Sequence, residues 1–442
     1  MITRSRSELL SRATDALQHA GNAEAEVLVR DVASSLTRFA NNTIHQNVSE
    51  RGTRWRARLI DGRHVAAAET SGDSDDAPGR LMKAAHQALR VAPESDPSPL
   101  PHPDGAEDSP VAFAGSTAAA TAEQRAAMVE TVVRAAEARG LVAFGYVSTD
   151  AVATAIANSA GLQRQATTTR CSAVVVLRGE DGSGYAARHA ADISGVDVGE
   201  LSAEAVETCE RNQNAVAQPP GDYEVVLSPY AVVELLTHLG WMGFSALAVQ
   251  EHRSFMRLGE RLMHERVVIR DDPRSEALFP FPFDAEGVTS RQVPLIDHGV
   301  CAGVVYDTPT AMHDGVASTG HSLPQPNTWG PFASHLEMQA GDTPRAELLA
   351  PIRRGLYVNR LWYVRNVHPL RTIITGMTRE GTFLIEDGSL GRAVRDLRFT
   401  QSIVDALSDV RGVSSERLVE LGEDESGVSA PWLHLGSFMF TS

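Results

Sequence analysis

Two proline-rich breaks divide the chain and limit how much of it can share one continuous core. Residues 92–117 (APESDPSPLPHPDGAEDSPVAFAGST) contain six prolines and several acidic residues without periodicity, which is typical of an exposed linker or long loop. Pro219-Pro220-Gly221 marks a second break. Since a chain of 442 residues is expected to form two or three domains, we place the boundaries at these breaks. The predicted units are residues 1–92, a linker at 93–120, residues 121–218 and residues 219–442.

The regions on either side of the linker repeat one order of patterns: a helix, several strands and a second helix. In the first region, an amphipathic helix near residues 7–20 precedes strand patterns, two of which meet at Asp61-Gly62, a dipeptide typical of hairpin turns. In the second region, Thr121 and Gln124 have the spacing of a capping box that starts a helix. The repetition predicts two mixed α/β modules and raises the possibility of a diverged duplication.

The region after Asp222 is dominated by strand patterns. One apolar run, residues 229–252 (PYAVVELLTHLGWMGFSALAVQEH), predicts a helix, and residues 400–410 predict a last helix before the tail. Turn signals stand at residues 297–299, 380–381 and 387–388. Hairpins of this kind imply antiparallel pairing. The predicted fold class is therefore α+β, with the mixed α/β modules first and a C-terminal domain rich in antiparallel β-sheet last.

Charge and composition exclude two classes of partner. The formal net charge of −16 at pH 7 is unfavourable for a nucleic-acid partner, because phosphate contacts need clustered positive charge. No stretch approaches the ~20 uninterrupted apolar residues that span a membrane, and the first residues lack the apolar core of a secretory leader. The cysteines Cys171, Cys209 and Cys301 have no metal-binding spacing. These features predict a cytoplasmic protein with neither a nucleic-acid nor a membrane partner.

Histidine and glutamate in the apolar run raise the question of a metal site. His238 and His252 are fourteen residues apart, so a continuous helix would place them on nearly the same face but ~21 Å apart along its axis. Two ligands of one zinc ion, each bound at ~2 Å, cannot be so far apart. The pairs Glu251-His252 and His264-Glu265 lack the second histidine of a zinc motif. Motifs for phosphate, dinucleotide or nucleophile chemistry are missing too, so the residues by themselves indicate no catalytic centre.

Five stretches, taken in order, resemble the TldD/PmbA family. They are SLTRFANNTIHQN (35–47), IANSAGLQRQATTTR (156–170), FDAEGVTSRQVPLIDHGVCAGVVYD (283–307), STGH (318–321) and GTFLIEDGSLGRAV (381–394). Each stretch alone is weakly specific, but the ordered set spans nearly the whole chain. The family consists of paired cytoplasmic proteins, TldD and TldE (also called PmbA), and the resemblance implies a zinc peptidase assembled from two kinds of chain.

The resemblance also implies which kind of chain this is. The TldD type carries an HExxxH motif in the apolar helix and a further cysteine ligand near the C-terminus. Here His238 falls at or within one residue of the first ligand position, whereas Leu239 replaces the glutamate and Gly243 replaces the second histidine. No cysteine follows Cys301. Because a catalytic zinc needs at least three protein ligands, the resemblance implies a TldE-type subunit without a cofactor, with the zinc on a TldD-like partner that contains HExxxH.

We therefore expect a non-metallated subunit of a heteromeric metallopeptidase, catalytic only in complex with that partner. It would help to form a chamber for a peptide or an unfolded protein, and its sheet edges would pair with an extended peptide. No residue is assigned a catalytic or metal-binding role. Six residues are candidates for lining the chamber: His238, Trp241, Asp284, Glu286, His313 and His321.

Two alternatives remain open from the sequence. One is a maturation peptidase subunit that releases a product from the tail of a peptide or carrier protein. The other is a divergent stand-alone hydrolase that uses Asp284, Glu286, His313 and His321, although carboxylates beside glycine usually form turns.

Overall fold

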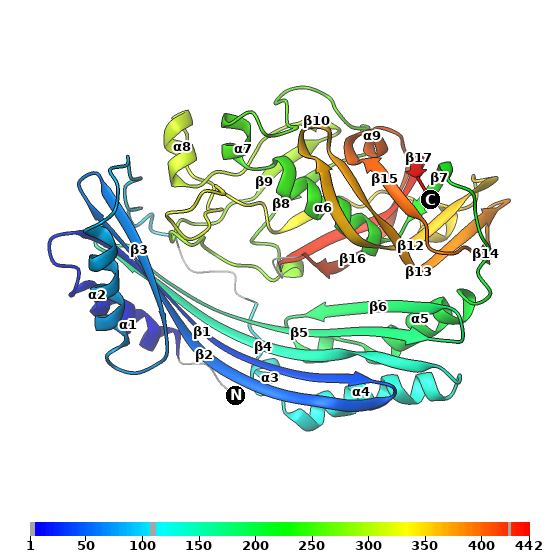
Figure 1. Cartoon of the computed structure of the whole chain (residues 1–442), viewed down its shortest axis with the longest axis horizontal. Helices are drawn as coiled ribbons and strands as arrows, with labels where there is room; N and C mark the ends of the chain where they lie inside the picture. The colour runs from blue at the N-terminus through cyan, green and yellow to red at the C-terminus, as the bar shows by residue number, and fades with distance from the viewer. Residues whose placement is uncertain (1–4, 107–111, 423–425) are drawn as a thin grey trace.

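The computed structural model describes residues 5–106, 112–422 and 426–442, and these residues form an α+β protein built on two large β-sheets (Figure 1). The N-terminal part supplies a six-stranded sheet and the C-terminal part an eleven-stranded one. The predicted fold class is confirmed. Within the described ranges, no helix has the length and apolar character needed to cross a membrane.

The N-terminal sheet is built from two modules with the same order of helix, three strands and helix. The first comprises α1 (Arg6–Leu17), β1 (Glu24–Ala40), β2 (Thr43–Asp61), β3 (His64–Ser71) and α2 (Ala77–Leu89). The second comprises α4 (Ala122–Glu137), β4 (Val142–Asn158), β5 (Gln163–Arg178), β6 (Ser183–Ala190) and α5 (Val198–Arg211). The strand order β3-β2-β1-β4-β5-β6 joins the modules where β1 pairs antiparallel with β4. The two regions predicted as separate units therefore share one sheet.

The strands of this sheet are longer than the sequence patterns indicate. Residues 43–61 and 142–158 each contain two strand patterns, yet each range forms a single strand, β2 or β4. The polar stretch from Ser49 to Gly52 stays extended because it is paired with β1 without interruption. Pairing along a neighbouring strand thus outweighs the local loss of apolar side chains.

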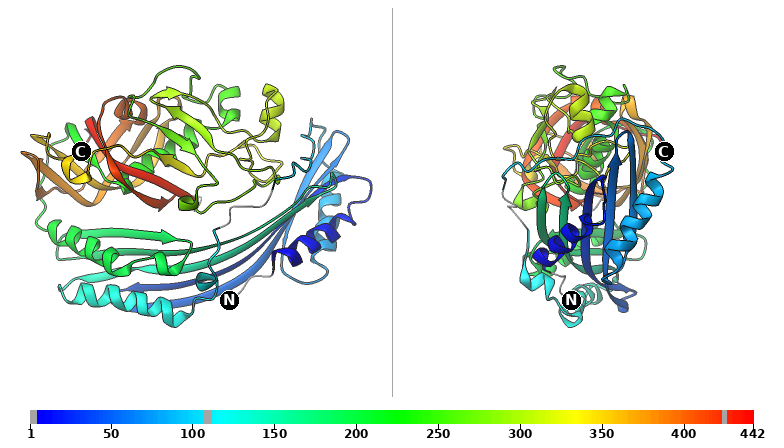
Figure 2. Two further views of the ribbon diagram at one scale, coloured as in Figure 1. Left: turned by 180° about the vertical axis from the view of Figure 1, so that it is seen from behind. Right: turned by 90° about the vertical axis from the view of Figure 1, so that its left-hand side faces the viewer.

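Both faces of the N-terminal sheet are covered, and by different parts of the chain. On one face, α1 and α2 pack against side chains such as Val27 and Trp55, and α4 and α5 pack against others such as Ala173. Alternate side chains point the opposite way, and there Ile156 packs with Phe283 of the C-terminal part. Figures 1 and 2 show the sheet curving beneath the C-terminal domain, with α1 and α4 on its outer side.

The proline-rich segment predicted as a linker lies partly against this sheet. Leu100 is buried, the Asn158 side chain donates to the Pro101 carbonyl at 2.8 Å, and the Arg164 guanidinium pairs with Asp104. The short α3 (Gly115–Ala118) follows, whereas residues 107–111 of the predicted linker lie outside the described residues. Side chains of the sheet satisfy polar groups of this segment, so much of it is bound rather than free.

The C-terminal domain combines short and long strands around one apolar helix. In chain order its elements are β7 (Gly221–Leu227), α6 (Pro229–Gly243), α7 (Ala246–Gln250), β8 (Ile269–Asp271), β9 (Val293–Asp297), β10 (Val300–Cys301), α8 (Thr308–Asp314), β11 (Leu336–Met338), β12 (Arg354–His368), β13 (Ile373–Glu386), β14 (Ser389–Ala393), β15 (Arg398–Ser402), α9 (Ile403–Ser408), β16 (Val410–Leu421) and β17 (Gly427–Phe440). Short 3₁₀ turns lie at Ile193–Gly195 (η1), Glu276–Leu278 (η2), Arg345–Glu347 (η3) and Pro369–Arg371 (η4). The sheet runs β10-β9-β8-β11-β17-β15-β13-β12-β7, with β14 beside β13 and β16 beside β17.

The sequence patterns miss one pair of strands in this domain and predict one turn wrongly. The tail beyond the last predicted helix forms β16 and β17. The sequence does not indicate these strands clearly, because β17 contains Pro431 and Gly436 and neither residue favours a strand interior. Residues 380–381 are not a turn between strands but lie inside β13, where φ values of 48° and 119° mark an irregularity in the strand. The predicted turns at 297–299 and 387–388 are confirmed, between β9 and β10 and between β13 and β14.

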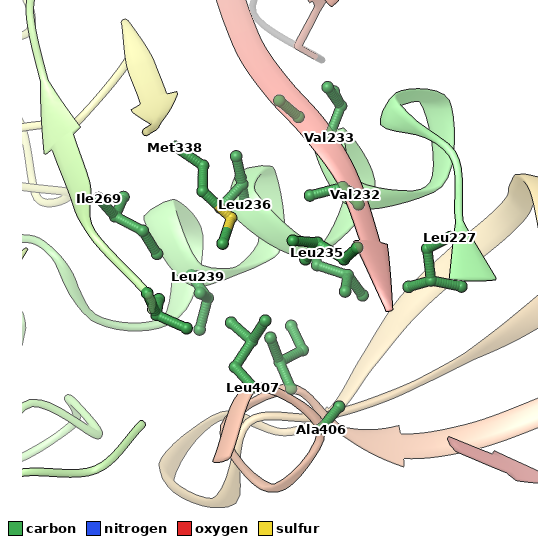
Figure 3. Packing of buried hydrophobic residues seen from close by; sticks show 14 of the residues in the cluster. Leu227, Val232, Val233, Leu235, Leu236, Leu239, Ile269, Met338, Ala406 and Leu407 are labelled. Atoms are coloured by element: carbon green, nitrogen blue, oxygen red, sulfur yellow. The ribbon is translucent and has the colours of Figure 1, made fainter. Parts of the chain in front are cut away.

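The apolar run 229–252 is not one helix, contrary to the prediction. α6 ends at Gly243 and the separate α7 starts at Ala246, because the backbone of Phe244 and Ala246 forms hydrogen bonds with Val305 instead of continuing the helix. α6 itself is the centre of the C-terminal core. Figure 3 shows its leucines and valines facing side chains from β7, β8, β11 and α9.

Replacing Gly145 by alanine tests how closely β4 and β5 are held together. The new Cβ would lie 2.0 Å from the carbonyl oxygen of Val174, at a φ of 147°, so the strands would have to move apart. We expect the free energy of unfolding to fall by about 3 kcal/mol or more, as measured by urea denaturation. Gly21→Ala is the control, because its φ is 66° but no heavy atom lies within 4 Å; it should cost about 1–2 kcal/mol. Equal losses in the two variants would contradict this account.

Candidate functional site

α6 enters the core directly from the sheet. β7 ends at Leu227, Ser228 occupies the N-cap in an extended conformation, and Pro229 stands in the first turn, where its missing N–H leaves no hydrogen bond unmade. The Ser228 hydroxyl donates to the carbonyl of Asn359 on β12. These contacts fix the position of the helix and its rotation about its own axis. Each side chain of α6 therefore faces a defined part of the protein.

The three positions aligned with the metal motif have surroundings that do not suit zinc. His238 is buried, and its Nδ1 lies 2.9 Å from the Glu234 carbonyl, a contact within the same helix. Leu239 is fully buried in the apolar core, where Figure 3 shows it beside Leu407. At Gly243 a Cβ would lie 2.4 Å from the ring of Phe255. A second histidine therefore has no room unless this ring moves.

Other possible ligands do not complete a site. His252 is exposed beyond the end of α7, at a φ of 56°, and since α6 and α7 are separate, the spacing derived for a continuous helix does not apply. Cys171, Cys209 and Cys301 are free and buried. Across the described ranges, no three His, Cys, Asp or Glu side chains are grouped so that they could hold a metal ion. The residues present therefore do not fit the zinc centre that the resemblance assigns to the TldD type.

A cavity of about 300 Å³ lies between the N-terminal sheet and the C-terminal domain. The sheet contributes side chains from β1 and β4, and loops of the C-terminal domain contribute the rest. The wall includes Phe281, Phe283 and Phe332, and it also includes Asp284 and His321. Such a largely apolar hollow with a few polar groups is typical of a binding site.

Asp284 and His321 are both held by the protein rather than left free to react. The Asp284 carboxylate accepts backbone N–H groups of Glu286, Val288 and Ser322 at 2.8–3.0 Å. His321 Nε2 lies 2.8 Å from the Asp271 carboxylate, and its Nδ1 lies 2.9 Å from the hydroxyl of Thr319. With both ring nitrogens engaged, His321 acts here as a bridge between loops.

Glu286 belongs to a buried ionic group that joins the N-terminal sheet to a loop of the C-terminal domain. Arg58 of β2 donates to Glu26 of β1 at 3.0 Å and lies 3.5 Å from Glu286 of the C-terminal domain. Glu286 also accepts the backbone N–H of Thr308 at 3.1 Å. Burial raises the pKa of Glu26 to about 7 and also raises the pKa of Asp284 and Glu286. One buried guanidinium thus compensates the charge of two buried carboxylates, Glu26 and Glu286.

Trp241 and His313, the two remaining candidates outside the cavity wall and the core, lie apart from each other. The Trp241 ring is 4.5 Å from the ring of Phe332, which lines the cavity, and 6.1 Å from that of Trp329. Phe332 therefore links the cavity wall to a partly exposed aromatic cluster formed by Trp241, Trp329 and Phe332. His313 is exposed on α8, where it contacts its neighbour Asp314.

The structure brings some candidates together and reveals others. Asp284 and His321 line the cavity, Glu286 lies behind it and Trp241 beside it, whereas His238 is enclosed in the core. Sequence reasoning missed Thr154, which lines the cavity from β4; its hydroxyl oxygen is buried and has no hydrogen-bond partner among the described residues. No sequence signal could have found it, because an alternating strand does not reveal which loops cover its face.

The pH dependence of stability tests the buried carboxyl of Glu26. Its folded-state pKa of about 7, against an ordinary 4.5, means that the folded chain binds more protons between pH 4.5 and 7, so stability falls as pH rises through this window. The shift corresponds to about 3 kcal/mol. We expect Glu26→Gln to reduce the fall in Tm between pH 5 and 8, and Glu24→Gln, at an exposed position of the same strand, to leave it unchanged. An unaltered slope in Glu26→Gln would refute the assignment.

Leu239→Glu introduces the glutamate that the resemblance assigns to the TldD-type motif, but position 239 lies in an apolar core. The carboxylate would enter the apolar core without a counter-charge, so we expect a loss of about 4 kcal/mol or more in the free energy of unfolding. Trp241→Glu on the same helix, at a position that is 41% exposed, should cost about 1–2 kcal/mol. Thermal unfolding followed by circular dichroism measures both. A Leu239→Glu variant as stable as Trp241→Glu would show that position 239 can face solvent.

Comparison with known sequences gives a family match over half of the chain. Residues 220–442 match the model described as the PmbA/TldA metallopeptidase C-terminal domain. A metalloprotease of Methanothermobacter thermautotrophicus is 26% identical over 327 residues, which cover 70% of this chain and 71% of that protein. The protein MJ0231 of Methanocaldococcus jannaschii is 30% identical over 186 residues, which cover 41% of this chain and 44% of that protein.

Solved structures match the whole fold. TldE from Thermococcus kodakarensis has a TM-score of 0.85 at 18% identity, with 99% of this chain and 100% of that chain covered. A Thermotoga maritima protein described as a modulator of a DNA gyrase has a TM-score of 0.83 at 18% identity, with 98% and 100% covered. At this identity the likeness shows the fold alone. The match over residues 220–442 goes further and confirms the resemblance: the chain belongs to the PmbA/TldA metallopeptidase family.

Proposed function

We propose that this chain is the TldE-type subunit of a two-chain zinc peptidase and has no metal centre of its own. It pairs in the cytoplasm with a TldD-like chain whose HExxxH motif holds the zinc. The observation that carries this proposal is the packing at Gly243, where the Phe255 ring lies 2.4 Å from the point at which a second ligand's side chain would begin. The buried Leu239, in place of a general base, supports it.

The stand-alone hydrolase alternative has less support. Its four residues do not meet, because His313 is exposed on α8 while Asp284 and His321 line the cavity. Asp284 is occupied by three backbone donors and His321 by Asp271 and Thr319. A general base must be able to reach a substrate proton, and neither side chain is placed to do so.

The contribution of this chain is to bind and shelter substrate. A zinc ion on the partner supplies an activated water and polarises the scissile carbonyl. On this chain the cavity offers the aromatic walls of Phe281, Phe283 and Phe332, which suit an apolar segment of a peptide.

Metal analysis and reconstitution test this proposal. The purified chain should contain far less than one zinc per molecule and should not cleave an unfolded protein such as reduced casein. Addition of the HExxxH homologue from the same genome should give cleavage, which that homologue alone shows weakly or not at all. A Glu→Gln change in the homologue's HExxxH motif should abolish the activity.

Two results would refute the proposal: stoichiometric zinc with hydrolysis by the isolated chain, or full activity of the homologue without this chain. Mass spectrometry of the products separates two uses of an active complex. Many cleavage sites indicate general proteolysis, whereas one site near the tail of a peptide or carrier protein indicates maturation of a product.

A further inference from the structure

The second half of β12 and the turn η4 expose an unusual number of large apolar side chains. Tyr363 is 67% exposed, Val367 56% and Leu370 51%, and Trp362 is 42% exposed. Between Trp362 and Arg371 only Val364 is buried. β12 and β13 extend toward the side of the C-terminal domain that faces away from the N-terminal sheet (Figure 1). We call the exposed residues of 362–371 the β12 surface.

The backbone of β12 is shaped so that neighbouring aromatic rings are both exposed. In a regular strand, consecutive side chains point to opposite faces. Here the register with β13 shifts between Trp362 and Arg365, and Tyr363 has a φ of 53°. A bulky residue in this left-handed region is costly, and such residues cluster at functional positions. The bulge leaves Trp362 and Tyr363 exposed together.

The charge around these rings is opposite to that of the rest of the chain. Residues 361–379 contain three arginines and no carboxylate, in a chain of net charge −16. Arg379 pairs with the buried Glu380 next to it, so the exposed positive charge comes mainly from Arg365 and Arg371. The Arg365 guanidinium lies 4.5 Å from the Tyr363 ring, and that of Arg379 lies 4.8 Å from the Trp362 ring. Stacking on the rings holds the guanidinium groups close to the apolar side chains.

We propose that the β12 surface docks the partner subunit, and that the partner's facing surface has an apolar centre with an acidic rim. The inference rests on the proposed function, which supplies the partner. Tryptophan, tyrosine and arginine carry most of the energy in protein interfaces, and a net-negative chain meets an acidic face best where its own charge is positive. Aromatic and arginine side chains also bind nucleic acid, but the overall charge repels phosphate.

A charge-reversed variant with a matched control tests the docking surface. Leu370→Asp/Arg371→Glu reverses an exposed apolar–arginine pair on the β12 surface. Arg90→Glu/Val91→Asp makes the same change at the end of α2, where Val91 is 83% exposed. With the HExxxH homologue, the β12 variant should raise Kd at least tenfold by biolayer interferometry, and the α2 variant should stay within twofold of wild type.

Tyr363→Gly provides a second variant that retains the fold. Glycine adopts the φ of 53° without strain, so the bulge persists and only the aromatic side chain is lost. We expect Kd to rise at least tenfold and Tm to be unchanged or higher. If Kd rises but Tm falls by several degrees, the loss of binding comes from a destabilised fold, and the assignment of the docking surface is overturned.

The other outcomes separate the docking surface from the proposed function. If wild type does not bind the homologue, both fail. If wild type binds and activates it while the β12 variants match the α2 control, only the docking surface fails. A homodimer by light scattering that the β12 variants dissociate, or retention of random-sequence DNA that they abolish, would replace the proposed partner with a second copy or a nucleic acid.

Discussion

The antiparallel pairing of β1 with β4 is the contact on which the rest of the architecture depends. It runs without a register shift from Glu26 opposite Asn158 to Phe39 opposite Gly145, and it turns two three-stranded modules into one long sheet. A single three-stranded module would be too narrow to pack against all of α1, α2, α4 and α5 on one face and the C-terminal domain on the other. Because alternate side chains of one strand face opposite sides, β1 places Val27 in the helix-facing core and Leu28 beside the cavity.

The junction above this sheet is polar at one point and apolar at others. Arg58 reaches from the sheet to Glu286, while Phe283 packs on Ile156 a short distance away. A buried ion pair is seldom a net source of stability, since its desolvation offsets its attraction. It is nevertheless selective for orientation, because a misplaced domain would leave the buried Glu286 without its counter-charge, while Arg58 would keep Glu26. The apolar contacts supply stabilisation, and the ionic group specifies the arrangement.

Much of the secondary structure could be predicted from local chemistry, and the site largely could not. Asp61-Gly62 and residues 387–388 specify tight turns whatever surrounds them, whereas β17 carries Pro431 and Gly436 and forms only because neighbouring strands pair with it. The end of α6 depends on Val305, about sixty residues away in sequence. Asp284 and His321 could be named from the resemblance, but Thr154, Phe332 and the link from Arg58 to Glu286 depend on how loops settle on a sheet. Local sequence patterns do not indicate which distant segments of the chain will lie close together in the fold.

The ring of Phe255 above Gly243 bears on the evolutionary history of the chain. A metal helix of the TldD type would require a histidine at 243, a glutamate at 239 and a smaller residue at 255, and a histidine introduced first would collide with the ring. A glutamate introduced first would be buried in the core beside Leu407. Each of these substitutions, made alone, lowers stability without yet creating a complete metal site. Such a path behaves as a ratchet: selection that refines packing in a chain of this kind makes a metal helix progressively harder to acquire.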